Sequence, residues 1–187
     1  MFEKDLPGQH STGFNAEQSV SALPLETAET MNNAWGFNLT DEHYKSAPDL
    51  IRYLVRAAGL NANFLLNVGP MPSGEIQPEF AQRLTEVGKW MKQYGDSIYG
   101  TRGGPVAAGP WGVTTQRGAT VYVHVLDWNQ PVLALAGIPR PVHLARLLRD
   151  GSSVEFSVVK SGLVLKLPEP QPEEVDRVIV LELEAAK

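Results

Sequence analysis

Residues 23–37 combine acidic, amide and aromatic side chains in one short stretch. The carboxylates in or near this stretch are Glu3, Asp5, Glu26 and Glu29. Hydrolysis of a glycosidic bond requires two carboxyl groups across a sugar ring, one acting as acid and base and the other as nucleophile or activator of water. An indole ring such as that of Trp35 can stack on the apolar face of a pyranose. These residue types therefore suggest a sugar-processing pocket.

Each of these side chains also has an ordinary structural interpretation. A loop glutamate such as Glu3 is more often solvated than catalytic, and a tryptophan such as Trp35 is more often part of a core. In an extended segment Glu29 faces away from Glu26, because side chains alternate along a strand. Asn67 ends a short apolar run, where sites built on parallel strands usually lie. Residue spacing alone does not identify an enzyme.

Residues 46–95 must position this stretch, and their pattern predicts helix, strand and helix. Ser46 supplies an N-cap for the first helix and Gly59 a stop, whereas Pro78 opens the second helix, which ends near Gly95. The apolar positions are Leu50, Ile51, Leu54, Val55 and Ala58 in the first helix, and Phe80, Leu84, Val87 and Met91 in the second. The intervening run 63–68 predicts a strand buried on both faces.

The C-terminal half has the alternation of short β-strands. Predicted strands cover residues 120–126, 132–135, 154–159, 163–167 and 178–183. Hairpin signals occur at 150–151 and 160–162. We expect an α/β plus all-β chain, in which residues 1–104 form the last part of a (β/α)8-like barrel and residues 105–187 a C-terminal antiparallel β-sandwich domain. Residues 1–22 show no period and are expected to form a long loop.

Composition excludes several classes of protein. The chain has 187 residues, 43% hydrophobic and 20% charged, with a net charge of −5. Without a basic excess we expect no binding to nucleic acid, and without a long apolar stretch no membrane span. The four histidines lack ligand spacing and cysteine is absent, so no metal and no cofactor are expected. The N-terminus has no signal-peptide pattern, which leaves the compartment open.

Three sequence blocks, in order, resemble a known family. They are Leu-Glu-Thr-Ala-Glu-Thr-Met-Asn-Asn-Ala-Trp-Gly-Phe at 25–37, Asn-Phe-Leu-Leu-Asn-Val-Gly-Pro-Met-Pro-Ser-Gly-Glu-Ile-Gln-Pro at 63–78, and residues 87–102, which include Tyr-Gly-Asp-Ser-Ile-Tyr-Gly-Thr-Arg. Together they resemble the α-L-fucosidases, the retaining enzymes of glycoside hydrolase family 29. The resemblance covers residues 1–102, and the β-rich remainder resembles the family only in architecture.

The resemblance implies hydrolysis of terminal α-linked L-fucose from glycans or glycoconjugates, with an aspartate nucleophile on an earlier barrel strand. This chain would therefore be the C-terminal portion of the enzyme and inactive alone. The resemblance points to Glu3 as acid/base, with Glu26 as the alternative acid/base or a pocket residue, and to Trp35 as the aromatic that contacts the sugar. The sequence departs from the family at Leu25, where tryptophan is usual, and at Ala28, where cysteine is common.

The expected partners follow from this assignment. They are a fucosylated glycan or aryl fucoside as substrate, the N-terminal half of the enzyme as a separate chain, and a second copy in a homo-oligomer. Two alternatives stay open. The chain could be a non-catalytic fucose-binding or interaction module that reuses the fold, or part of a different retaining glycosidase.

Overall fold

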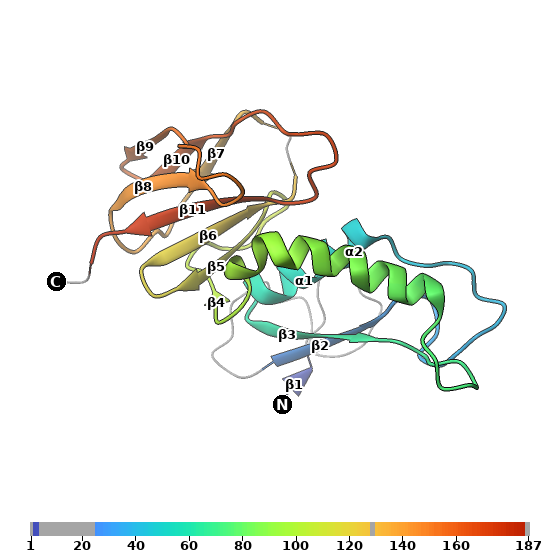
Figure 1. Cartoon of the computed structure of the whole chain (residues 1–187). Coiled ribbons are helices and arrows are strands. Elements are labelled where there is room, and N and C mark those ends of the chain that lie inside the picture. The colour runs from blue at the N-terminus through green and yellow to red at the C-terminus, as the bar shows by residue number, and fades with distance from the viewer. Residues whose placement is uncertain (1, 4–24, 128–129, 186–187) are drawn as a thin grey trace.

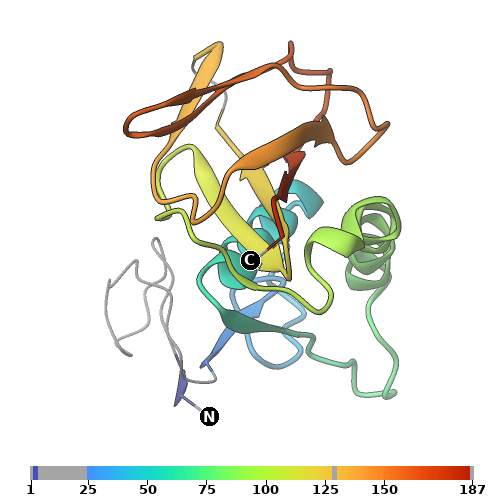
Figure 2. The same ribbon diagram turned by 90° about the vertical axis from the view of Figure 1, so that its left-hand side faces the viewer.

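The computed structural model describes residues 2–3, 25–127 and 130–185. Figure 1 shows two helices between a parallel sheet on one side and antiparallel strands on the other. The turned view in Figure 2 shows the same arrangement, with the strands of the parallel sheet below the helices and the antiparallel strands above. Most of the loop predicted for residues 1–22 lies outside the described residues.

The parallel sheet has the strand order β1-β2-β3. Its strands are β1 (Phe2–Glu3), β2 (Leu25–Thr30) and β3 (Ala62–Asn67), and helix α1 (Ala47–Gly59) joins the last two. This is a βαβ unit, the usual way to connect parallel strands. The sequence did not predict β2, because its Leu-Glu-Thr-Ala-Glu-Thr residues lack an apolar alternation.

Helix α1 begins and ends at the predicted residues, but Gly59 is not the residue that turns the chain. The Ser46 hydroxyl accepts a hydrogen bond from the Asp49 amide at 3.2 Å, which caps the first turn. Gly59 is the last helical residue, yet the left-handed residue that turns the chain is Asn61, with a φ of 61°. Gly59 instead permits a close approach, since a Cβ there would lie 2.4 Å from Val113 Cβ. Packing, not chain reversal, requires the glycine.

The two faces of α1 pack on different sheets. Ile51 and Val55 are buried in a cluster that includes residues of the antiparallel strands. Ala57 belongs to a second cluster with Leu25 at the start of β2. The helix therefore joins the parallel sheet to the rest of the molecule.

Helix α2 (Pro78–Tyr94) continues into the short 3-10 helix η1 (Gly95–Ser97). Its predicted apolar face is wrong at Leu84, which is 43% exposed. The helix instead buries Trp90 and Tyr94, whose rings stack with centroids 5.3 Å apart. Phe80 is buried as predicted, and Val87 and Met91 pack against the same cluster as Trp90 and Tyr94.

The antiparallel strands form two sheets. The five-stranded sheet has the order β4-β5-β6-β11-β8 and the three-stranded sheet the order β7-β10-β9. The strands are β4 (Arg102–Gly103), β5 (Gly112–Arg117), β6 (Thr120–Val125), β7 (Val132–Leu135), β8 (Val142–Leu147), β9 (Phe156–Val159), β10 (Gly162–Lys166) and β11 (Arg177–Leu183). The predicted strands all occur, and the two-residue turn at 160–161 joins β9 to β10 as expected. Strands β4, β5 and β8 were not predicted.

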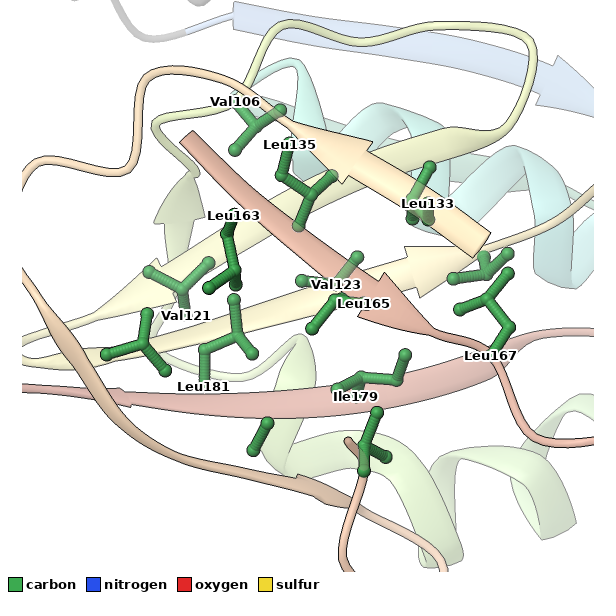
Figure 3. Packing of buried hydrophobic residues seen from close by; sticks show 14 of the residues in the cluster. Val106, Val121, Val123, Leu133, Leu135, Leu163, Leu165, Leu167, Ile179 and Leu181 are labelled. Carbon is green, nitrogen blue, oxygen red and sulfur yellow. The ribbon is translucent and has the colours of Figure 1, made fainter. Parts of the chain in front are cut away.

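Strand β11 is buried on both sides. Ile179 and Leu181 point into the apolar core between the two antiparallel sheets, which Figure 3 shows. Val178 and Val180 belong to the cluster that contains α1 and α2. Burial on both faces explains why this strand reads as a continuous apolar run rather than as an alternation.

Strand β3 is not buried on both faces, so that prediction is wrong. Phe64 packs against Tyr53 of α1, with ring centroids 5.0 Å apart. Asn63 and Leu65 point to the opposite face and are exposed, Leu65 by 41%. Helix α1 covers one face of the parallel sheet, and among the described residues no helix or strand covers the other.

Candidate functional site

The loop that carries Trp35 lies at the carboxyl end of the parallel sheet. Trp35 follows β2 by five residues, and its side chain is 60% exposed. Asn67, the last residue of β3, donates a hydrogen bond from Nδ2 to the Trp35 carbonyl oxygen at 2.7 Å. Gly69 approaches the same loop so closely that a Cβ there would lie 2.4 Å from the carbonyl carbon of Gly36. Two adjacent strand ends are therefore tied together beneath an exposed indole ring.

Asp41 closes the far side of this loop. Its nearly buried carboxylate accepts hydrogen bonds from the amides of Asn33 at 2.8 Å and His43 at 3.1 Å. Burial opposes the charged form of Asp41, but the hydrogen bonds from His43 and Asn33 outweigh it and lower the pKa of the carboxyl group. The carboxylate is therefore charged at neutral pH and holds the two ends of the segment 33–43 together.

Lys45 anchors the start of the loop. Its Nζ donates to the carbonyl oxygens of Thr30 at 2.8 Å and Asn32 at 3.1 Å. The same Nζ lies 3.3 Å from Glu29 Oε1. Glu29 therefore neutralises a lysine that holds the backbone, which gives this carboxylate a structural task.

Glu26 lies at the opposite end of β2 from the Trp35 loop. It is the second residue of the strand, and its Oε2 accepts a hydrogen bond from Asn63 Nδ2 at 2.9 Å. Glu26 and Thr30 lie four residues apart along the strand, a distance of roughly 13 Å. The backbone of Glu3 in β1 pairs beside Glu26, and the side chain of Glu3 lies outside the described residues. The structure thus brings the two glutamate backbones together but separates Glu26 from Trp35.

A chain of buried polar groups crosses the five-stranded sheet, and the sequence did not reveal it. His124 Nδ1 lies 2.7 Å from Asp176 Oδ2, and Thr115 Oγ1 lies 3.3 Å from His124 Nε2. The single Thr115 hydroxyl proton goes to the Ser97 carbonyl oxygen at 2.6 Å, so His124 Nε2 must carry the proton of the other bond. Burial raises the pKa of Asp176, and the nearby His124 opposes this. The order of groups is that of a nucleophilic triad, but full burial excludes substrate.

One groove of the described residues lies away from Trp35. A cavity of about 540 Å³ is bounded by the start of β3, helix α1 and residues 98–102. Its walls are mainly apolar, with Phe64 and Tyr99 among them. It lies at the amino end of the parallel strands, whereas sites on parallel sheets are built at the carboxyl end.

Two features are absent from the described ranges. No group of three or more histidine, cysteine, aspartate or glutamate side chains there could hold a metal ion. No helix among those residues has the length and apolar character needed to cross a membrane.

Comparison with known proteins places these elements in a family. The model of the family described as alpha-L-fucosidase matches residues 1–96, a segment that contains the parallel sheet, the Trp35 loop and both helices. The chain belongs to the alpha-L-fucosidase family.

Relatives of this fucosidase-family chain are longer than it is. It is 31% identical to alpha-L-fucosidase of Branchiostoma floridae over 145 residues, which are 72% of this chain and 32% of the relative. It is 28% identical to tissue alpha-L-fucosidase of Mus musculus, covering 83% of this chain and 36% of the relative. The chain therefore spans about a third of the length of these curated relatives.

Solved fucosidase structures match nearly the whole of this fucosidase-family chain. Alpha-L-fucosidase isoenzyme 1 from Paenibacillus thiaminolyticus is 35% identical, with a TM-score of 0.81 over 98% of this chain and 44% of the other. A bacterial fucosidase with a bound inhibitor is 25% identical, with a TM-score of 0.84 over 100% of this chain and 42% of the other. The match extends through the antiparallel strands, which the sequence blocks did not reach.

Two residues of this site were missed from the fucosidase-family sequence. Gly69 and Asp41 are not among the candidate residues that the sequence predicts. The signal for Gly69 was the Gly-Pro step directly after Asn67. No local pattern marks Asp41, because its partners lie two and eight residues away on a loop without regular structure.

Proposed function

We propose that this chain is the C-terminal portion of a retaining α-L-fucosidase that removes terminal α-linked L-fucose from glycans or glycoconjugates. The observation that carries this proposal is the family match over residues 1–96, which includes the strand ends where Trp35 and Asn67 meet.

The finer architecture belongs to the same proposal. Strands β1 to β3 with their helices are the last part of a (β/α)8-like barrel, in residues 1–104, and residues 105–187 are the antiparallel β-sandwich domain. The exposed face of β3 supports the barrel, because parallel sheets bury both faces. Leu65 on that face would then point into the barrel and contact the N-terminal portion, which we propose as a separate chain. A second copy of this chain is the alternative partner for the same face.

Roles within the site follow from position. Glu3 in β1 is the proposed acid/base, as the family resemblance implies, and Glu26 is the alternative. The hydrogen bond from Asn63 Nδ2 to the Glu26 carboxylate supports this order, whereas strand position does not separate the two residues, because sheet register places Glu3 level with Glu26. Trp35 is the proposed sugar platform, since its ring is exposed beside that end.

Chemically, the acid/base protonates the glycosidic oxygen as the leaving group departs, while an aspartate of the N-terminal portion forms the covalent fucosyl-enzyme. The acid/base, now deprotonated, then takes a proton from the water that hydrolyses this intermediate. The two carboxyl groups should lie about 5–5.5 Å apart in the assembled site, as retention requires.

The test is complementation. The purified chain should not hydrolyse an aryl α-L-fucoside, and addition of an N-terminal portion from a related fucosidase should restore turnover. Hydrolysis by the chain alone would refute the separate nucleophile. Cleavage of another glycoside, with the fucoside inert in the assembly, would indicate a different retaining glycosidase.

Two matched variants assign the acid/base within the complemented enzyme. Glu3→Gln should slow poor leaving groups far more than activated aryl fucosides, because only poor leaving groups need protonation. Glu26→Gln is the control, and the reverse pattern would exchange the two roles.

One feature favours a second candidate function, a non-catalytic fucose-binding module. The Trp35 loop is tied in place by contacts within this chain, so it could bind sugar without the N-terminal portion. Tight L-fucose binding by the chain, with no hydrolysis after complementation, would favour this function over the enzyme.

A further inference from the structure

The exposed indole of Trp35 sits on a loop with no regular secondary structure, so other contacts must set its position. A side chain that is 60% exposed gains little from packing. The backbone beneath it, however, makes two specific contacts with the end of β3. These contacts come from Asn67 and Gly69, which lie two residues apart on one short segment.

Asn67 supplies the directional contact. Its Nδ2 donates to the Trp35 carbonyl oxygen at 2.7 Å, the length of a good hydrogen bond. Side chains alternate along β3, so Asn67 points to the same face as Leu65 and Asn63. That face is the one that α1 leaves uncovered. Asn67 therefore fixes the loop on the uncovered side of the sheet.

Gly69 supplies the steric contact. A Cβ at this position would lie 2.4 Å from the Gly36 carbonyl carbon and 2.6 Å from the Phe37 nitrogen. Both are backbone atoms, so no side chain could rotate away to make room. Gly36 is the opposite case, because a Cβ there would meet nothing within 4 Å. The close approach therefore requires glycine at position 69 but not at position 36.

We propose that Asn67 and Gly69 are positioning residues, which hold the Trp35 loop against the end of β3 so that the indole presents its face to the sugar. This inference rests on the proposed function for its sugar-binding part only. Neither residue needs to contact the substrate. Their effect on binding passes through Trp35, and this separates them from residues that contact the sugar themselves.

The first experiment needs no activity. Amide hydrogen exchange of the purified chain, followed by mass spectrometry of peptides covering residues 31–43, reports how firmly the loop is held. Gly69→Ala, Asn67→Asp and Asn67→Ala should each accelerate exchange roughly tenfold or more. Gly36→Ala adds the same methyl group to the other side of the contact and should leave exchange unchanged.

Three outcomes of this experiment would overturn the positioning role. The first is unchanged exchange in Gly69→Ala. The second is equal acceleration in Gly36→Ala. The third is acceleration in Asn67→Asp without acceleration in Asn67→Ala, because repulsion of the Trp35 carbonyl by the new charge would then explain the result.

The second experiment uses the complemented enzyme and an aryl α-L-fucoside. Gly69→Ala and Trp35→Ala should each raise KM roughly 2- to 10-fold with little change in kcat, as expected for lost aromatic contact in ground and transition states alike. In the Trp35→Ala background, Gly69→Ala should not raise KM further, because its effect on KM depends on the Trp35 ring.

The two experiments separate the two claims. A raised KM in Trp35→Ala with a normal KM in Gly69→Ala overturns the positioning role. A normal KM in Trp35→Ala removes Trp35 from the sugar site, which contradicts the proposed function whatever the exchange experiment shows. Full additivity of the two substitutions would mean that Gly69 acts on substrate binding independently of Trp35, which also overturns the inference.

Discussion

Gly59, the last residue of α1, lies where any side chain would collide with strand β5. A Cβ there would be 2.4 Å from Val113 Cβ and 2.5 Å from Val113 Cγ2. Carbon atoms in contact prefer about 3.5–4.0 Å, so Gly59→Ala must push the helix end and the strand apart by about 1 Å. Overpacking of this kind costs about 1–3 kcal/mol, and the better helix propensity of alanine recovers at most about 1 kcal/mol. Because the two shortest contacts lie about 1 Å or more inside the preferred contact distance and Val113 is buried, the overpacking cost falls in the upper part of its range, about 2–3 kcal/mol, and we expect a net loss of about 1–2 kcal/mol.

Gly88 on α2 provides the matched control. It is exposed, and a Cβ there would meet nothing within 4 Å. Gly88→Ala should therefore raise stability by roughly 0.5–1 kcal/mol through helix propensity alone. The same substitution thus has opposite signs on the two helices. Urea unfolding followed by circular dichroism measures both, with equal m-values showing that the extent of unfolding is unchanged.

A double variant locates the cause. In the Gly59→Ala background, Val113→Gly should remove the collision, because alanine at position 113 would keep the Cβ that lies 2.4 Å away. The double variant should therefore lose less stability than the sum of the two single variants, by about 1 kcal/mol or more. If Gly59→Ala were neutral or stabilising, as Gly88→Ala is expected to be, α1 would not pack on β5. This result would refute the packing of the parallel sheet and its helix against the antiparallel strands.

Three further predictions concern charged groups. Asp176→Ala should cost roughly 3–5 kcal/mol in urea unfolding, because it leaves His124 Nδ1 buried without a partner. Asp176→Asn keeps an acceptor for this atom and should cost roughly 1–2 kcal/mol. Equal losses of stability in the two variants would contradict this. Hydrogen bonds from neighbouring groups, chiefly a serine hydroxyl, hold the pKa of Asp150 well below its ordinary value, so its contribution is present above about pH 4 and lost as pH falls through the lowered pKa. Asp150→Asn should therefore lower stability at pH 7, and its difference from wild type should shrink below about pH 4. Lys45→Met should cost roughly 1–2 kcal/mol, because it removes the hydrogen bonds from Nζ to the Thr30 and Asn32 carbonyl oxygens and leaves Glu29 without this lysine. The exposed control Lys89→Met should cost less than about 0.5 kcal/mol.

Local chemistry was enough to predict both helices and several strands. Ser46 and Pro78 mark helix starts by properties that belong to one or two residues, a side-chain acceptor and a fixed φ. Strand β6 alternates apolar and polar residues, and a glycine-containing turn precedes β10. Both signals can be recognised in a short segment of sequence. Strand β2 escaped prediction because its pattern of polar residues makes sense only once β3 pairs beside it and α1 covers one face.

The sequence by itself determined the family, the order of helices and strands, and the residues around which a sugar site could form. These properties depend on residue identity and short-range spacing. Only the tertiary structure decided which carboxylates lie together, because sheet register aligns Glu3 with Glu26 and places Glu26 at the far end of β2 from Trp35. It also decided that Gly69 approaches the Trp35 loop, since a contact between backbones 32 residues apart leaves no mark in either segment alone.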